Sequence, residues 1–108
     1  MKLYNATRKI ILATNLKEAK SAMDKLLGLH LKTNPRSLLF NTRFGIHTLF
    51  LREAIDILVL NSKKNVVVAK TLKPNRILLY NPIYSMVIEL PCGTISKSKT
   101  KIGDQLTF

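Results

Sequence analysis

Apolar residues in the first third of the chain follow a helical spacing. Between Leu16 and Leu27 they recur at steps of three and four residues, the period of one helical face. Asn15 stands where an N-cap is expected, Glu18 follows three residues later, and Gly28 comes after the last apolar position. The pattern predicts a helix that begins at about Leu16 and ends before Gly28.

After Pro35 the apolar residues form short runs of Val, Ile, Leu and Phe, separated by Asn, Pro, Ser, Lys and Gly. Such runs and separators are typical of strands and turns. An earlier short run before the helix has the same character. The predicted strands are Arg8–Ala13, Ser37–Phe40, Ile46–Leu51, Ile55–Leu60, Val66–Leu72, Ile77–Tyr80, Ser85–Leu90 and Gln105–Phe108. The polar segment 61–65 has the length and composition of a hairpin loop.

These elements predict a single α+β domain over residues 1–108 that is mostly β. The expected architecture is a small antiparallel, partly closed barrel or sandwich with one N-terminal helix. No interior stretch resembles an interdomain linker, so one core is expected. Its main members should be Leu16, Met23, Leu26, Leu39, Ile57, Val59, Val67, Val87 and Ile88.

Composition restricts the location and the chemistry of the protein. The longest apolar runs are four residues, far short of the roughly 20 that a spanning helix needs. No secretory signal pattern follows Lys2, so we expect a cytoplasmic protein without a transmembrane segment. Cys92 is the only cysteine, which excludes an intrachain disulfide and fits a reducing compartment.

The chain is strongly basic, with a formal net charge of +12. Such an imbalance favours contact with polyanions. In the second half of the chain, the residues suited to phosphate contacts are Lys63, Lys64, Lys97, Lys99 and Lys101. Residues 96–101 alternate Ser or Thr with Lys, and as an exposed loop they would either form a basic rim or remain solvated. The chain has no Trp, so any nucleic-acid binding should be weak and non-specific.

Three segments resemble one known family. His47-Thr48 leads through Arg52 and Ile55-Asp56 into an apolar strand, Glu-Leu-Pro-Cys-Gly-Thr spans 89–94, and Gly-Asp at 103–104 precedes the last strand. In order and spacing they resemble domain of unknown function 192, a bacterial and archaeal family, over about residues 8–108. The resemblance supports the fold and implies no established activity. Many members of that family look exported, which this chain does not.

The polar residues within or beside these segments define a candidate ligand site, because barrel mouths commonly host such sites. Its members are His47, Thr48, Arg52, Asp56, Glu89 and Asp104. Asp56 shares a strand face with Leu58 and Leu60, so two roles are open for it. A buried carboxylate would need a structural partner such as Arg52 or backbone donors, whereas an accessible one would serve a ligand.

The sequence carries no complete catalytic or metal signature. The chain has two histidines, without a metal-binding spacing, and Cys92 lacks the local signature of a nucleophile. We therefore assign no catalytic residue and expect no metal and no cofactor. The first hypothesis is a non-enzymatic module that binds a small molecule or a protein partner. The second is a weak electrostatic nucleic-acid binder, and the third is a hydrolase whose site the sequence does not assemble.

Overall fold

The computed structural model of the chain describes residues 1–18, 37–43, 45–48 and 53–108. In chain order the strands are β1 (Leu3–Asn5), β2 (Ile10–Ala13), β3 (Lys17–Glu18), β4 (Leu38–Asn41), β5 (Gly45–His47), β6 (Ile55–Leu60), β7 (Val66–Leu72), β8 (Ile77–Leu79), β9 (Met86–Pro91) and β10 (Leu106–Thr107), and the helix between β9 and β10 is α2 (Thr94–Ser98). The predicted α+β class with mostly β structure is confirmed.

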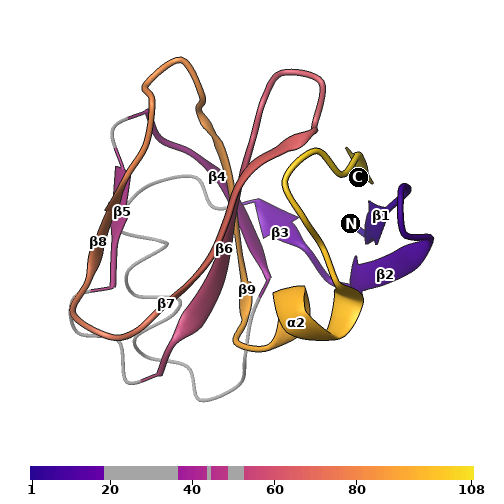
Figure 1. The fold of residues 1–108 in the computed structure, drawn as a ribbon, viewed down its shortest axis with the longest axis horizontal. Coiled ribbons are helices and arrows are strands. Elements are labelled where there is room, and N and C mark those ends of the chain that lie inside the picture. Colours follow the sequence, from indigo (N-terminus) through magenta and orange to yellow (C-terminus); the bar gives the residue numbers. More distant parts are fainter. Residues whose placement is uncertain (19–36, 44, 49–52) are drawn as a thin grey trace.

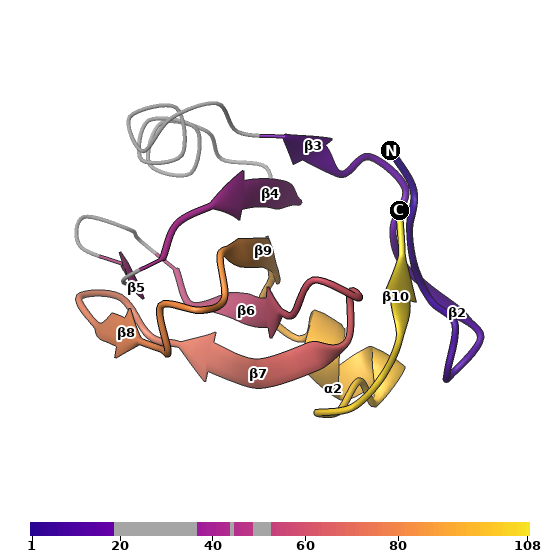
Figure 2. The same ribbon diagram turned by 90° about the horizontal axis from the view of Figure 1, so that it is seen from above.

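Three sheets make up the described structure. The central sheet has the order β3-β4-β9-β6-β7, and the smaller sheets are β10-β1-β2 and β5-β8. All pairs are antiparallel except β3 with β4. The central sheet lies between the two smaller ones (Figures 1 and 2). No helix in the described ranges is long and apolar enough to cross a membrane.

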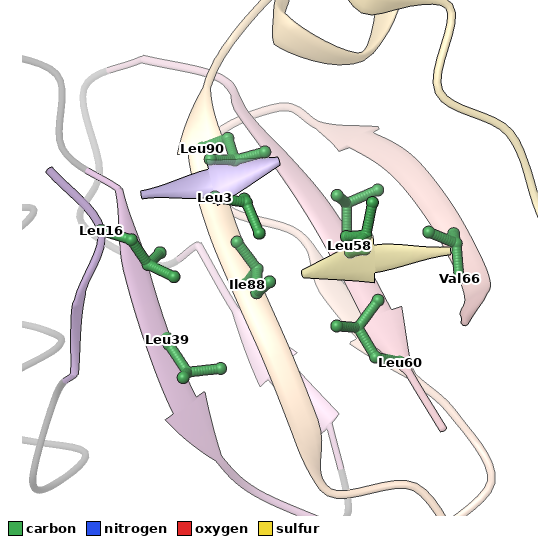
Figure 3. Packing of buried hydrophobic residues seen from close by; sticks show 9 residues of the cluster. Leu3, Leu16, Leu39, Leu58, Leu60, Val66, Ile88 and Leu90 are labelled. Carbon is green, nitrogen blue, oxygen red and sulfur yellow. The ribbon is translucent and has the colours of Figure 1, made fainter. Parts of the chain in front are cut away.

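Both faces of the central sheet are buried, and β6 shows this most directly. All six of its residues are buried, so alternate side chains enter two different clusters. Leu58 and Leu60 pack with Leu3 of β1 and Leu106 of β10 on one face (Figure 3). The opposite face carries a second cluster, described below. A strand covered on both sides needs mostly apolar residues, and Asp56 is the one polar residue of β6.

The second cluster lies under the β5-β8 sheet. Ile57 of β6 packs there with Ile46 of β5 and Leu78 of β8. The prediction of one shared core is therefore wrong, because the apolar residues of the central sheet divide between its faces. Of the expected members, Leu16, Leu39 and Ile88 belong to the first cluster, whereas Ile57, Val59, Val67 and Val87 belong to or pack against the second. Met23 and Leu26 lie outside the described residues.

The predicted start of the helix is also wrong. Lys17 and Glu18 are extended in β3, where they pair in parallel with Leu38 and Leu39 of β4. The Lys17 amide donates to the Ser37 carbonyl at 3.0 Å. Tertiary pairing thus overrides the local capping signal. The rest of the predicted helix, through its end before Gly28, lies outside the described residues.

The strand predictions are most accurate in the long apolar runs. β6 and β7 have the predicted bounds, and residues 61–65 connect them as an antiparallel hairpin. β2, β4, β8, β9 and β10 match within about two residues at each end, and β5 covers the start of the strand predicted from Ile46. The short strands β1 and β3 were not predicted. The sequence pattern does not predict α2 either, because it indicates a turn at 93–94 and an exposed loop at 96–101.

Candidate functional site

Asp56 is the second residue of β6 and is fully buried. One carboxylate oxygen accepts a hydrogen bond from the Thr71 hydroxyl of β7 at 2.6 Å, and the other accepts from the Ile95 amide of α2 at 2.8 Å. Gly93, the N-cap residue of α2, provides no side-chain cap, so Asp56 satisfies an amide of the first helical turn from a distant strand. Asp56 therefore joins β6, β7 and α2.

Glu89 is fully buried too, but on the other face of the central sheet. In the strand register Glu89 stands opposite Leu38 and Ile57, which belong to the second cluster. Asp56 stands opposite Leu90, which belongs to the first. Directly opposite residues point to the same face of a sheet. The two predicted site carboxylates are therefore separated by the sheet and do not converge.

Thr48 anchors the chain after β5 to the loop before β8. Its hydroxyl donates to the Lys73 carbonyl at 2.6 Å and accepts from the Arg76 amide at 2.8 Å. Its backbone amide donates to the Arg76 carbonyl, and its carbonyl accepts from the Asn75 amide. These contacts account for the full burial of Thr48. The backbone of His47 pairs with Ile77, and Arg52 lies outside the described residues.

Asp104 belongs to a buried polar network at the other end of the molecule. Its carboxylate accepts from the Asn5 side-chain amide at 3.0 Å, from Arg8 Nε at 2.9 Å and from the Lys101 amide at 3.0 Å. The Asn5 side-chain amide also donates to the Thr100 hydroxyl at 3.1 Å. The network ties the turn after β1 to the segment before β10.

Charge and hydrogen bonding keep Asp104 ionised. Burial by itself raises the pKa of this carboxyl. The hydrogen bonds from Asn5, Arg8 and the Lys101 amide, together with the Arg8 charge, oppose that effect, and the net result is a pKa below the ordinary value of 3.8. The carboxylate therefore neutralises Arg8 from within the fold.

The polar side chains of the family-like segments mostly serve the chain itself. Thr48, Asp56 and Asp104 each bond to a neighbouring segment, and the Thr94 hydroxyl donates to the Pro91 carbonyl at 2.7 Å. Asp56 also connects two of the resembling segments, because its partner Ile95 directly follows the second one. Binding of a ligand by these residues stays a prediction.

Basic residues from distant parts of the sequence come together around residues 104–106. The Ala6 amide donates to the Gln105 carbonyl, and the Leu106 amide donates to the Lys64 carbonyl. The Gln105 side chain donates to the Lys63 carbonyl at 2.7 Å. The turn between β1 and β2 and the β6–β7 loop thus flank this segment, which Figure 1 shows in yellow beside the β6–β7 loop.

The segments that meet here carry exposed lysines. We call Lys9, Lys63, Lys99 and Lys101 the basic rim. Lys9 and Lys99 have positive φ angles of 57°, at the β1–β2 turn and at the C-cap of α2. Of the predicted lysines, Lys97 is exposed on α2. Lys64 is engaged, because its Nζ donates to the Phe108 carbonyl at 3.0 Å and lies 4.1 Å from the Phe108 ring centroid.

The interpretation of residues 96–101 as a uniformly exposed loop is wrong. Residues up to Ser98 belong to α2, and Ser98 and Thr100 are buried. Their hydroxyls lie 2.7 Å apart, and the Ser98 hydroxyl donates to the Thr94 carbonyl. Because the small polar residues turn inward, Lys99 and Lys101 remain outside. Lys9 was missed because only folding brings its turn beside Gln105.

Exposed Glu53 lies away from Lys63 of the basic rim. Asp56, Glu89 and Asp104 are buried, whereas Glu18 and Glu53 are exposed. Glu53 comes just before β6, and Lys63 lies in the loop just after β6. The length of this strand therefore separates the two residues. Within the same ranges no group of three or more His, Cys, Asp or Glu residues is arranged to hold a metal ion.

Comparison with known sequences assigns the family. A UPF0127 protein of Pyrococcus furiosus is 32% identical over 112 residues, covering 98% of this chain and 97% of its own length. The chain belongs to the UPF0127 family. A second UPF0127 protein, from Pyrococcus horikoshii, is 31% identical with the same coverage. A third, from Pyrococcus abyssi, is 38% identical over 71 residues, which are 64% of this chain and 61% of that protein.

Solved structures share the fold of this UPF0127 chain. A proposed transcription regulator of Sinorhizobium meliloti has a TM-score of 0.75 at 19% identity, covering 98% of this chain and 89% of that one. A protein of unknown function from Novosphingobium aromaticivorans has a TM-score of 0.74 at 13% identity, covering 99% and 82%. At these identities the likeness concerns the fold alone. No family model matches the chain.

Proposed function

We propose that this UPF0127 protein is a non-enzymatic binding module whose basic rim contacts the phosphates of a nucleic acid. The observation that carries the proposal is the meeting of three lysine-bearing segments around residues 104–106, joined by the hydrogen bonds of Gln105 and Leu106. Asp104 is buried next to these segments, and its carboxylate already accepts hydrogen bonds from Arg8 and Asn5. The four rim lysines therefore keep their charge available to a polyanion.

The chemistry of the rim implies weak, sequence-independent binding. Lysines contact phosphates as point charges and read no bases. Each engaged lysine releases counterions, so the logarithm of the binding constant should fall with log salt by about 0.9 per phosphate contact on duplex DNA. Four contacts would give a slope of roughly −3.6. A preference for one DNA sequence would need side chains that reach base edges. The rim is defined by lysines alone, so no such preference is expected.

Fluorescence anisotropy with a labelled DNA duplex tests this function across a series of salt concentrations. The decisive variant carries Lys63→Glu, Lys99→Glu and Lys101→Glu. Its matched control carries Lys17→Glu, Lys70→Glu and Lys73→Glu, which reverses the same number of exposed lysines elsewhere. We expect the rim variant to lose binding at moderate salt, while the control variant keeps most of the affinity and of the salt slope.

Equal losses in the two variants would contradict a localised rim and indicate attraction by net charge alone. Tight binding to one DNA sequence that survives moderate salt would contradict the non-specific mode. Denaturant unfolding of both variants should stay within about 0.5 kcal/mol of the parent, since the exchanged side chains are exposed.

Two finer points belong to the same proposal. The family-like segments resemble domain of unknown function 192, and we propose that UPF0127 chains such as this one share that domain. We also propose a cytoplasmic location, which suits a protein that meets nucleic acid. The proposed transcription regulator with this fold shares only 19% of the residues, so its described role does not carry the argument.

A further inference from the structure

A second surface stands out at the opposite side of the molecule, on the outer face of β8. Leu78 points into the second cluster, so its neighbours Ile77 and Leu79 point outward, where they are 67% and 75% exposed. Ile83, in the turn after β8, is 70% exposed. Large aliphatic side chains gathered at one exposed edge indicate a contact surface more often than isolated ones do.

This apolar edge is held by a rigid support. Residues 80–84 are tied to the segment between β4 and β5, because Arg43 Nη1 donates to the Pro82 carbonyl at 3.2 Å and the Tyr80 hydroxyl donates to the Thr42 carbonyl. Gly45 stands opposite Leu79 at φ +147°, and a Cβ on Gly45 would lie 2.9 Å from Leu79 Cδ2 and 2.5 Å from the Leu78 carbonyl oxygen. Because Gly45 has no Cβ, the Leu79 side chain can lie against its backbone.

The surroundings of the edge are basic. Arg43, Lys73 and Arg76 are exposed on the segments that flank β5 and β8. The stretches 42–48 and 73–85, which include β5 and β8, contain no Asp and no Glu, and exposed Glu53 lies just before β6. We define the apolar-basic face as Ile77, Leu79 and Ile83 together with Arg43, Lys73 and Arg76. Three aliphatic side chains thus project from a positively charged border.

We infer that the apolar-basic face docks on the surface of an anionic membrane. Aliphatic side chains can enter the boundary between headgroups and acyl chains, while each nearby cation is attracted to an anionic leaflet. A second copy of the chain would bring the same positive border against itself. A stable protein interface buries about 800 Å² on each partner, which is much for a face with three projecting aliphatic residues.

Vesicle sedimentation tests the inference with the whole chain. The probes are phosphatidylcholine vesicles with and without about one third phosphatidylserine. Leu79→Ser combined with Ile83→Ser should weaken partitioning to the anionic vesicles by about tenfold or more, because two aliphatic side chains no longer leave water. Ile102→Ser is the matched control, since Ile102 is 69% exposed and lies next to the basic rim. It should partition like the parent.

A fluorescent reporter follows insertion directly, because the chain has no Trp of its own. Ile83→Trp should shift its emission to shorter wavelength on adding the anionic vesicles, and Ile102→Trp should not. The inference would be overturned if the serine double variant and the control partitioned equally to the anionic vesicles. It would also be overturned if the parent partitioned equally to the neutral and the anionic vesicles. A concentration-dependent dimer that the double variant abolishes would also overturn it. The serine double variant should leave DNA binding unchanged.

Discussion

The two small sheets cover opposite faces of the central sheet by different means. The β10-β1-β2 sheet adds a buried polar network to its apolar contacts, with Asn5 and Asp104 at its centre. The β5-β8 sheet packs Ile46 and Leu78 inward and is joined to its neighbouring loop by Thr48. One side therefore depends on hydrogen-bonded partners far apart in sequence, and the other on simple alternation along short strands.

This difference explains the surfaces of the two sides. On the β10 side, Asp104 turns inward to Arg8 and Asn5, and the lysines of the basic rim remain outside. On the β8 side, alternation buries Leu78 and leaves Ile77 and Leu79 outside. Figure 2 shows β10 and β8 on opposite sides of the central sheet. A single small domain thus offers a charged surface and an apolar-basic one, well separated.

The largest expected effect tests whether both sides depend equally on the central sheet. Ile57 and Leu58 are each fully buried, one on each face. Ile57→Ala and Leu58→Ala should each lower the free energy of unfolding by about 2–5 kcal/mol, because each leaves a cavity in a packed cluster. Urea unfolding measures the cost. A midpoint unchanged by either substitution would contradict the two-core description.

A smaller effect is expected at Asp56, which belongs to the β10 side of the comparison. Asp56→Asn places an amide NH₂ group where the Thr71 hydroxyl and the Ile95 amide now donate. We expect a loss of about 1–3 kcal/mol with the fold retained, because a buried donor then lacks an acceptor. Amide exchange should speed up in α2 and stay unchanged in β8. A variant as stable as the parent would indicate that Asp56 serves a ligand instead.

The smallest effect is the pH dependence of the Asp104 network. The folded-state pKa of Asp104 lies below the ordinary value of 3.8, so the unfolded chain binds the proton more readily. The stabilisation is therefore complete above that ordinary pKa and is lost as the pH falls through the lower folded value. Urea midpoints of the parent and of Asp104→Asn should converge on acidification below about pH 4. A constant difference across that range would contradict the assignment.

The sequence predicts elements that depend on local apolar patterns, and it does not predict those that depend on contacts between distant segments. Residues 55–60 and 66–72 are recognisable because each strand is mostly apolar and a polar loop joins them. The sequence does not predict β1, because its three residues form a strand only by pairing with β10 at the other end of the chain. The sequence does not predict α2 for a similar reason. The acceptor for its Ile95 amide is Asp56, 39 residues earlier.

The candidate site was less predictable than the strands. Alternation correctly placed Asp56 beside Leu58 and Leu60, and backbone donors were foreseen as its possible partners. The same rule could not relate Asp56 to Glu89, because strand pairing and register between β6 and β9 decide which face each side chain takes. The lysines at 63, 99 and 101 were identifiable by type, but their meeting with Lys9 depends on the contacts around Gln105.

The central claim, that the basic rim contacts nucleic acid, is tested most directly by mapping the contact on the folded protein. Amide resonances of a ¹⁵N-labelled chain are followed while a short DNA duplex is added at low salt. We predict that the largest shifts fall on residues 6–9, 61–65 and 99–106 and disappear as salt is raised, while β5 and β8 stay unperturbed. Shifts spread evenly over the surface, or concentrated on β8, would contradict the account.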